Sequence, residues 1–333
     1  MSKNSRQINY RLRIAKSVER KMFCSTFQKL SVFHPLEDYK YIGFGALYFA
    51  DFYLIHRQLG VKNMLSIEKS HSKDTQTRYN FNKPFKCIDI EFKPSSVILP
   101  RLKWVEPSIV WLDYTSVLND EVLSDLDTVL KNVVSGSFII ISVNADAEEF
   151  EPSPDDDPEK SRLDFFIKAI GKRKLPRELK NNQITNLGLP KAYAQIISKE
   201  IETTLFERNS GSSSKEIIFE QLFSFKYKDG KPMYTFGGLV IESDQKKIVD
   251  DIKFDELHFI RRGEDVFEIE VPNLTFKEIK FLESLLPGGI DDKGKIKDLE
   301  KLTQNDPKIP EKDIVKFAKI YQYFPTFAET NLG

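Results

Sequence analysis

Two glycines and a carboxylate are the residues of this chain whose types and spacing best suit chemistry. Gly43 and Gly45 interrupt the apolar run that begins at Tyr39, and Glu68 follows the next apolar run, residues 64–67. Glycines in such a turn let a ligand approach the backbone, and a carboxylate at the end of the following strand accepts hydrogen bonds from ribose hydroxyls. This pattern is typical of a βαβ unit that binds an adenosine-containing cofactor. The alternative is a tight turn without a ligand, with Glu68 as a solvated carboxylate.

A second carboxylate, Asp113, directly follows the apolar run at residues 108–112. Parallel α/β sheets bind ligands beyond the carboxyl ends of their strands, so Asp113 is in the right place to act as a base or to orient a hydroxyl or amine. Tyr114 beside it would stack on a substrate. The alternative for Asp113 is a cap for the helix that begins near Asn119.

The composition predicts a protein that folds without metal or disulfide bonds. The 333 residues include 40% hydrophobic ones, and 50 Lys and Arg balance 50 Asp and Glu. Zero net charge excludes a global field for nucleic acid, so any polyanion site is a local patch. Cys24 and Cys87 form no CxxC pair and the four histidines lack metal-ligand spacing, so we expect reduced thiols and no metal. The absence of a signal peptide and of long apolar runs predicts a cytoplasmic protein without a membrane partner.

Strands and helices alternate over the first half of the chain. Uniformly apolar strands are typical of a parallel sheet that helices cover on both faces, so the pattern predicts a doubly wound α/β core. The expected strands span residues 39–43, 63–68, 86–92, 108–113 and 137–143, and the expected helices span residues 48–59, 72–80 and 121–133.

The second half predicts an antiparallel hairpin that closes the sheet. The hydrophobic pattern changes to a period of two at residues 217–227 and 233–241, with Asp229-Gly230 as the turn. Before the hairpin we expect a loop at residues 146–158, helices at 161–179 and 183–200, and a linker at 208–214. After it we expect a strand pair at residues 256–261 and 266–271, a helix from the capping box at Thr275 to Leu286, and a last helix at 311–323.

Basic residues gather in two places. An amphipathic helix over residues 6–30 interleaves Arg11, Arg13, Lys16 and Arg20 with apolar side chains, and a second cluster spans residues 172–177. One interpretation is a solvated helix surface. The other is a contact with a substrate anion, a nucleotide or nucleic acid, for which Arg11 and Arg13 are the candidates.

The order of these elements resembles the class I S-adenosylmethionine-dependent methyltransferases, in which parallel strands precede a terminal antiparallel hairpin. The resemblance covers residues 37–243, and residues 9–21 and 37–143 are also similar to poorly characterised bacterial proteins labelled O-methyltransferases. It implies a Rossmann-like, doubly wound, mostly parallel seven-stranded sheet and S-adenosyl-L-methionine as the cofactor. The implied reaction is methyl transfer to an O- or N-nucleophile of an acceptor that the sequence does not identify.

The resemblance implies roles for residues of the first motif and of the strand ends. Tyr48 stands where the usual signature continues to a third glycine, and we expect it to cover the cofactor. Asp89 and Ile90 would hold the adenine, with Glu91 as the alternative if the strand register slips by two. Asp113 and Tyr114 would be the catalytic residues beside the transferred methyl group. The implied cofactor-binding residues are Gly43, Phe44, Gly45, Tyr48, Glu68, Lys69, Asp89, Ile90 and Asp113.

Departures from the family pattern leave other functions open. The third glycine is missing, and the segment Asp113-Tyr114-Thr115-Ser116 lacks the Pro-Pro of enzymes that methylate exocyclic nitrogens of bases, which disfavours a DNA base methyltransferase. One alternative is a catalytically degenerate sensor or partner subunit that acts with another protein or with a second copy of the chain. Others are a nucleic-acid-binding module that uses the basic patches and, more remotely, an NAD-linked oxidoreductase.

These elements divide into three expected parts. A basic amphipathic helix occupies residues 1–36, and a methyltransferase-like Rossmann domain occupies residues 37–243. Residues 147–213 would form a helical insertion or cap within that domain. A C-terminal α+β appendage would occupy residues 244–333.

Overall fold

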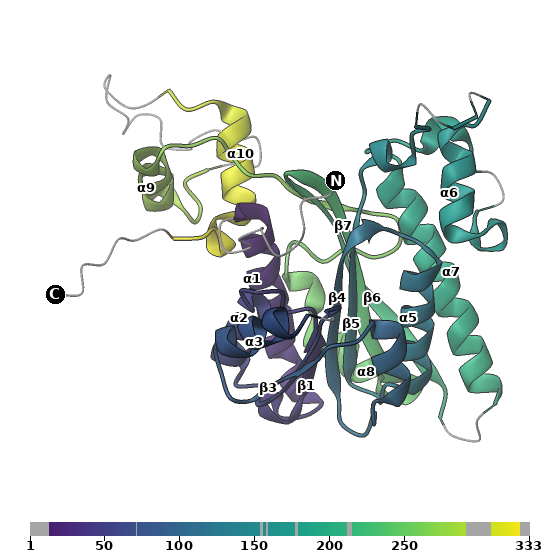
Figure 1. Cartoon of the computed structure of the whole chain (residues 1–333). Coiled ribbons are helices and arrows are strands. Elements are labelled where there is room, and N and C mark those ends of the chain that lie inside the picture. Colours follow the sequence, from purple (N-terminus) through teal and green to yellow (C-terminus); the bar gives the residue numbers. More distant parts are fainter. Residues whose placement is uncertain are drawn as a thin grey trace.

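A single mixed sheet forms the centre of the molecule (Figure 1). The computed structural model describes residues 13–70, 72–153, 156–157, 159–176, 179–211, 215–290 and 308–326. Within them, eight strands are arranged in the order β3-β2-β1-β4-β5-β7-β6-β8. β1 to β5 are mutually parallel, and β7 is antiparallel to both β5 and β6. The expected doubly wound sheet with a terminal antiparallel hairpin is therefore confirmed.

The strand bounds follow the apolar runs closely. The strands are β1 (Lys40–Gly43), β2 (Asn63–Ile67), β3 (Ile88–Glu91), β4 (Ser108–Val117), β5 (Ser137–Asn144), β6 (Ile217–Asp229), β7 (Lys231–Glu242) and β8 (Phe267–Ile269). β8 pairs in parallel with β6 and adds an eighth strand to the expected seven. The chain moves outward in opposite directions from β1 and β4, so the carboxyl ends of these two neighbours flank the switch point at which such sheets bind ligands.

Helices cover both faces of the sheet (Figure 1). On one face, α1 (Ile14–Gln28), α2 (Ala50–Leu59) and α3 (Lys73–Asn82) share a core with Tyr41 and Trp111. On the other face, α5 (Asp120–Asn132) and α7 (Leu189–Ser210) share a core with Ile42 and Val110. Successive strand residues point to opposite faces, and both cores are apolar, which explains why these strands are apolar throughout.

The segment expected as a helical cap is divided in the structure. α6 (Arg162–Ile170) is shorter than expected, and short 3-10 turns follow it. α7 begins later than expected, at Leu189, and continues to Ser210 through part of the expected linker. Its Tyr193, Ile196 and Ile197 are buried in the core that also contains α5. α7 is therefore one of the helices that cover the sheet, whereas the boundaries of the three expected parts remain a prediction.

The expected strand pair after the hairpin is only half present. β8 forms, but residues 254–256 form a 3-10 turn and the next residues are not a strand. Phe259 and Ile260 are buried in this segment without pairing to a neighbouring strand.

Two helices end the described chain. α9 (Phe276–Leu285) begins at the expected capping box, in which Thr275 Oγ1 accepts the Glu278 N–H and Glu278 Oε2 accepts the Thr275 N–H. α10 (Glu311–Ile320) follows, and α8 (Lys246–Ile252) and the one-turn α4 (Ser95–Ile98) complete the helices that the structure describes.

The β6–β7 hairpin holds the start of α1. Asp229 in the hairpin accepts the backbone N–H groups of Lys16, at 2.8 Å, and Ala15, at 3.3 Å. A carboxylate at this point satisfies N–H groups of the first turn that have no partner within the helix, and it complements the helix dipole. The hairpin therefore fixes where α1 crosses the sheet.

Candidate functional site

A cavity of about 470 Å³ opens at the carboxyl ends of β1, β2 and β4. Its volume lies within the range of roughly 300–1,000 Å³ that small-molecule sites occupy. The described residues that line it come from the carboxyl-terminal parts of β2 and β4, from the loops after β1, β2 and β3, and from α1, α2, α4 and α5: Arg20, Phe44, Gly45, Ala46, Tyr48, Ala50, Asp51, Ile67, Glu68, Lys69, Lys93, Pro94, Ser95, Ser96, Asp113, Tyr114, Thr115, Ser116, Glu121 and Asp125.

The glycine loop and the end of β2 form one hydrogen-bonded unit. The Gly45 N–H donates to Ser66 Oγ at 3.0 Å, and the Ser66 hydroxyl donates to Glu68 Oε1 at 2.9 Å. The Ala46 N–H donates to the same carboxylate oxygen at 2.9 Å. Glu68 is only 9% exposed, so these donors compensate the cost of burying its carboxylate. The unit fixes Glu68 at the wall of the cavity.

Gly45 has no room for a side chain. A Cβ at this position would lie 2.5 Å from a ring carbon of Phe49 and 2.8 Å from Ser66 Oγ. The loop then continues through two non-glycine residues with left-handed backbone, Ala46 (φ 48°) and Phe49 (φ 46°). Such residues cost of order 1–3 kcal/mol and persist only where surrounding packing fixes them. Phe49 is fully buried against Phe52 and Tyr79, so side-chain packing stabilises this turn. The signature that the resemblance implies would have its third glycine in this part of the chain.

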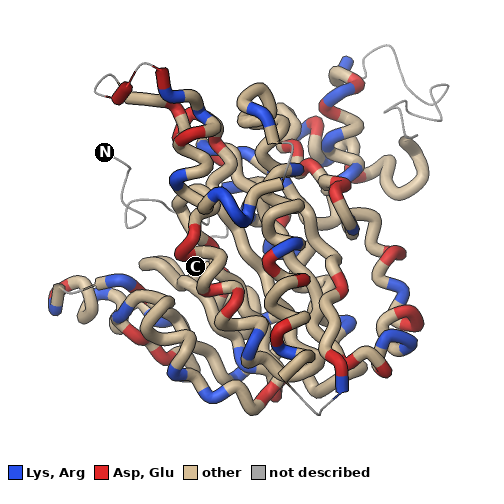
Figure 2. The backbone as a smooth tube through the Cα atoms, turned by 90° about the vertical axis from the view of Figure 1, so that its right-hand side faces the viewer, with Lys and Arg blue, Asp and Glu red and all other residues tan. Residues whose placement is uncertain are grey.

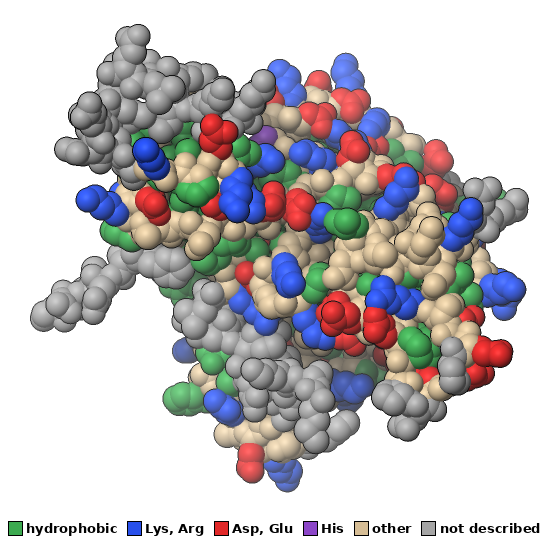
Figure 3. Space-filling model, turned by 90° about the horizontal axis from the view of Figure 1, so that it is seen from above, with side chains coloured by type: hydrophobic (Ala, Val, Ile, Leu, Met, Phe, Trp, Pro, Cys, Tyr) green, Lys and Arg blue, Asp and Glu red, His purple; other side chains and the backbone are tan. Residues whose placement is uncertain are grey.

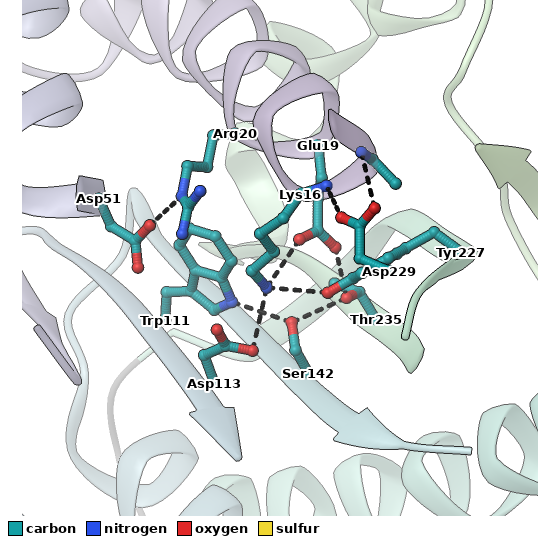
Figure 4. Close-up of polar contacts among 11 residues, drawn as sticks. Lys16, Glu19, Arg20, Asp51, Trp111, Asp113, Ser142, Tyr227, Asp229 and Thr235 are labelled. Atoms are coloured by element: carbon teal, nitrogen blue, oxygen red, sulfur yellow. Dashed lines mark hydrogen bonds and ion pairs between the residues drawn. The ribbon is translucent and has the colours of Figure 1, made fainter. Parts of the chain in front are cut away.

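Asp113 meets a buried lysine from α1 (Figure 4). Lys16 Nζ lies 3.0 Å from Asp113 Oδ1, 2.8 Å from Glu19 Oε2 and 3.0 Å from the Tyr227 hydroxyl. It also lies 4.3 Å from the centre of the Trp111 ring. Burial by itself lowers the pKa of Lys16, but the carboxylates of Asp113 and Glu19 outweigh burial and hold it well above its ordinary value. The lysine is therefore a fixed positive charge behind Asp113.

Glu19 connects this cluster to the hairpin strands (Figure 4). Thr235 Oγ1 donates to Glu19 Oε1, and Ser142 Oγ lies 2.7 Å from Thr235 Oγ1. The Trp111 indole N–H donates to Ser142 Oγ at 3.0 Å. Burial raises the pKa of Glu19, and the Lys16 ammonium opposes that rise. The cluster thus joins α1 to β4, β5 and β7 through polar side chains.

A second ion pair joins α1 to α2 at the cavity. Arg20 Nε donates to Asp51 Oδ1, and both residues are buried and line the cavity (Figure 4). Burial by itself lowers the pKa of Arg20, but the Asp51 carboxylate outweighs burial and raises it. For Lys16 and Arg20 the expectation of a solvated basic helix surface is wrong, because both side chains point inward to carboxylates.

Tyr114 is anchored to the next helix. Its hydroxyl donates to Asp125 Oδ2 at 2.6 Å, and the Ser95 hydroxyl donates to the same oxygen. Its ring meets the edge of Phe44, with 5.1 Å between ring centres. Burial raises the pKa of Tyr114 well above its ordinary value and also raises the pKa of Asp125. The cluster ties the loop after β3 to β4 and α5.

The cavity brings together most of the residues that the sequence selected. Those in its lining are Phe44, Gly45, Tyr48, Glu68, Lys69, Asp113 and Tyr114. Gly43 ends β1 and is buried; a Cβ there would lie 3.0 Å from the Trp111 carbonyl oxygen. Arg13 lies just before α1 and is not part of the described lining, and Arg11 lies outside the described residues.

The expected adenine-binding pair lies away from this cavity. Asp89 is exposed within β3, and Ile90 packs against the core. Neither belongs to the described lining, which takes Lys93, Pro94, Ser95 and Ser96 from the same region. Asp89 and Ile90 lie within β3, which ends at Glu91, and the lining residues of this region follow the strand in the chain.

The sequence analysis did not predict the part that four other residues play in the site. Ser66 looked like part of an apolar strand, and Asp51 looked like an ordinary charge in the first turn of a helix. Lys16 and Arg20 share one face of α1 because they are four residues apart, and that spacing was the available signal.

Two further tests of the described residues bear on function. They contain no group of three or more His, Cys, Asp or Glu side chains arranged to hold a metal ion. Across the same ranges, every helix is too short or too polar to cross a membrane.

With this geometry established, the sequence can be placed in a family. The family model described as "Putative O-methyltransferase" matches residues 8–332. The chain belongs to this family. None of the curated proteins matches the chain significantly.

Several solved structures share a loose likeness with this member of the O-methyltransferase family. The transferase PH0793 from Pyrococcus horikoshii is 9% identical, with a TM-score of 0.35 over 66% of this chain and 64% of that one, so the chain spans less than two thirds of it. The O-methyltransferase TomG from Streptomyces achromogenes, in complex with SAM, is 13% identical, with a TM-score of 0.34 over 66% of this chain and 79% of that one. TYW2 from M. jannaschii, in complex with AdoMet, is 10% identical, with a TM-score of 0.35 over 66% and 76%. At these scores, family membership rests on the sequence model.

Proposed function

We propose that this chain is an S-adenosylmethionine-dependent methyltransferase that acts on an oxygen or nitrogen nucleophile of a small acceptor. The observation that carries the proposal is the unit of Gly45, Ser66 and Glu68 beside Asp113, at the switch point of the sheet. Family membership supports the reaction class, and an oxygen nucleophile is the acceptor group that the family description favours.

The residues of the cavity fit this cofactor by charge and by hydrogen bonding. We propose that Glu68 accepts the ribose hydroxyls, and that the loop at Gly45 and Ala46, together with Asp113, meets the amino-acid end. Lys69 and residues 93–96 would surround the adenine, in the role that the sequence suggested for Asp89 and Ile90. When bound, S-adenosylmethionine supplies a methyl group on a positively charged sulfonium.

The balance of charges separates this cofactor from a dinucleotide. The described lining contains five acidic residues, Asp51, Glu68, Asp113, Glu121 and Asp125, and three basic ones, Arg20, Lys69 and Lys93. Arg20 pairs with Asp51, and Asp113 pairs with Lys16, so three acidic residues remain against two basic ones. An acidic site favours a cationic ligand and disfavours the diphosphate of NAD.

Asp113 has the position to prepare the acceptor. Its Oδ1 faces Lys16, and among the described residues no donor is within hydrogen-bond distance of its Oδ2. We propose that this oxygen, which has two lone pairs, accepts hydrogen bonds both from the O–H or N–H of the methyl acceptor and from the ammonium group at the amino-acid end of the cofactor. In-line methyl transfer depends mainly on such positioning, so one orienting carboxylate is enough.

The nucleic-acid alternative loses part of its support. Lys16 and Arg20 are buried in ion pairs, and Lys174 of the second cluster pairs with Asp120 and Glu200. Basic and acidic residues lie interspersed over the molecule in Figures 2 and 3. A polyanion-binding surface would need a continuous basic patch.

Calorimetry tests the proposal. We expect wild-type protein to bind S-adenosylmethionine and S-adenosylhomocysteine but not NAD. Glu68→Gln keeps an oxygen for the Ala46 N–H yet removes the charge, so affinity for both ligands should fall about tenfold or more. The matched control is Glu106→Gln, which removes a carboxylate that pairs with Asn63 just before β4, remote from the cavity lining. Tight NAD binding, or no binding of either adenosyl ligand, would refute the proposal.

Transfer of a labelled methyl group separates an enzyme from a sensor. Wild-type protein and Asp113→Asn are incubated with labelled cofactor and a small-molecule cell extract. We expect label in the extract with wild type and a large loss with Asp113→Asn. Ligand binding without transfer to any extract fraction would favour the sensor.

A further inference from the structure

We propose that Lys16 of α1 is a positioning residue for Asp113, which it holds as the acceptor for the ammonium group at the amino-acid end of the cofactor. The inference rests on the proposed function. It means that the N-terminal helix completes the site instead of only covering the sheet.

The contacts of Lys16 hold its ammonium group from three elements. The group donates to Asp113 Oδ1 and to the Tyr227 hydroxyl, each at 3.0 Å, and forms an ion pair with Glu19 Oε2 at 2.8 Å. These acceptors come from β4, α1 and β6, and the Trp111 ring closes a further side. Lys16 is 2% exposed, so water competes little for these contacts. A charge held by three elements fixes the carboxylate that it contacts.

The Asp113 carboxylate contacts the cluster around Lys16 on one side and lines the cavity on the other. Oδ1 of Asp113 faces Lys16, while the Asp113 side chain is 14% exposed and lines the cavity. Both oxygens belong to one rigid, planar carboxylate group, so a contact that holds Oδ1 in place also fixes the direction in which Oδ2 points. Without Lys16, Asp113 and Glu19 would repel each other across the cluster, and the Asp113 side chain would turn away.

The backbone of Lys16 is fixed independently of its side chain. Asp229 in the β6–β7 hairpin accepts the Lys16 N–H at 2.8 Å, so the hairpin fixes the position of the Lys16 backbone relative to the sheet. A substitution of the Lys16 side chain therefore leaves the start of α1 capped, and its effect on ligand binding is separable from an effect on the position of the helix.

A double-mutant cycle measured by calorimetry tests the inference. The variants are Lys16→Met, Asp113→Asn and both together, each titrated with S-adenosylhomocysteine and with 5′-methylthioadenosine, which lacks the amino-acid part. We expect each single variant to lose about tenfold in affinity for S-adenosylhomocysteine, and the double variant to lose no more than Asp113→Asn alone. Affinity for 5′-methylthioadenosine should not change, because that ligand has no ammonium group.

The controls separate positioning from folding. Lys21→Met removes another lysine of α1, one that donates to the Phe324 carbonyl away from the cavity, and should leave both affinities unchanged. If Lys16→Met does not fold, the cycle is repeated in a Glu19→Gln background, where no second buried carboxylate is left unpaired.

The outcomes distinguish the two proposals. Three results would overturn the role of Lys16 and leave the proposed function standing. The first is that the affinity losses of the two single variants add in the double variant, and the second is that Lys16→Met binds S-adenosylhomocysteine like wild type. The third is that Lys16→Met loses as much affinity for 5′-methylthioadenosine as for S-adenosylhomocysteine. Failure of wild-type protein to bind either adenosyl ligand would overturn both.

Discussion

Replacing Gly45 with alanine should damage both the fold and the cavity. The new Cβ would lie 2.5 and 2.7 Å from two ring carbons of Phe49 and 2.8 Å from Ser66 Oγ. Phe49 is fully buried and its ring packs edge-on against Phe52 and Tyr79, so it has little room to move. Overpacking of this kind costs about 1–3 kcal/mol of unfolding free energy.

The same clash should weaken ligand binding. If the loop moves to relieve the clash, the Gly45 N–H leaves Ser66 and the Ala46 N–H leaves Glu68, and the carboxylate loses its fixed position. If the displaced Glu68 then makes one charge-assisted hydrogen bond fewer to the ribose, affinity for S-adenosylhomocysteine should fall about tenfold. Denaturant unfolding measures the first effect, and calorimetry measures the second.

Gly60→Ala is the matched control. Gly60, unlike Gly45, has a left-handed backbone (φ 74°), but no atom lies within 4 Å of a Cβ placed there. Alanine should therefore cost about 1–2 kcal/mol of backbone strain and leave ligand affinity unchanged. The reasoning is refuted if Gly45→Ala binds S-adenosylhomocysteine like wild type, or if both variants lose affinity equally.

Two further predictions concern α1. Asp229→Ala removes the acceptor for the Lys16 and Ala15 N–H groups and should lower the free energy of unfolding by about 1 kcal/mol in a urea titration; an unchanged midpoint would show that the hairpin does not hold the helix. Native protein treated with iodoacetamide and mapped by mass spectrometry should be modified at half-buried Cys87 before Cys24, which is 5% exposed and whose pKa burial raises to about 12. Equal rates at the two cysteines would mean that α1 does not stay packed on the sheet.

Local signals were enough to predict the framework of the fold. The glycine turn, the carboxylate after β2 and the Asp229-Gly230 hairpin each depend on a few neighbouring residues, and the structure places all of them as expected. Each signal has a physical cause that acts over a short stretch of chain, namely backbone freedom at glycine and turn geometry. Prediction from sequence is most secure for such features.

It was harder to predict which residues lie at the edge of the sheet and reach the cavity. Whether Asp89 or a later residue reaches the cavity depends on where β3 ends, and the alternation of apolar and polar residues at 88–92 does not determine that point. Strand ends depend on pairing with β2, in which Ile67 is opposite Glu91. Asp89 and Ile90 thus lie within β3, a few residues before the part of the chain that lines the cavity.

The ion-pair partners of the basic residues on α1 could not be predicted from the sequence of that helix alone. Lys16 and Arg20 find Asp113 and Asp51 at separations of 97 and 31 residues. A balanced net charge gives no indication of which acids lie opposite which bases. Long-range ion pairs of this kind become visible only when the fold brings their partners together.

The buried cluster around Lys16 is better explained by function than by stability. Removing charges from water is expensive, and replacing a buried ion pair with well-packed apolar residues is often neutral or stabilising. Lys16, Glu19 and Asp113 nevertheless occupy a place between apolar side chains such as Trp111 and Phe23. Apolar groups at all three positions would serve the core as well, but they would leave no cation to fix a carboxylate at the cavity. We therefore include α1 in the site that we propose.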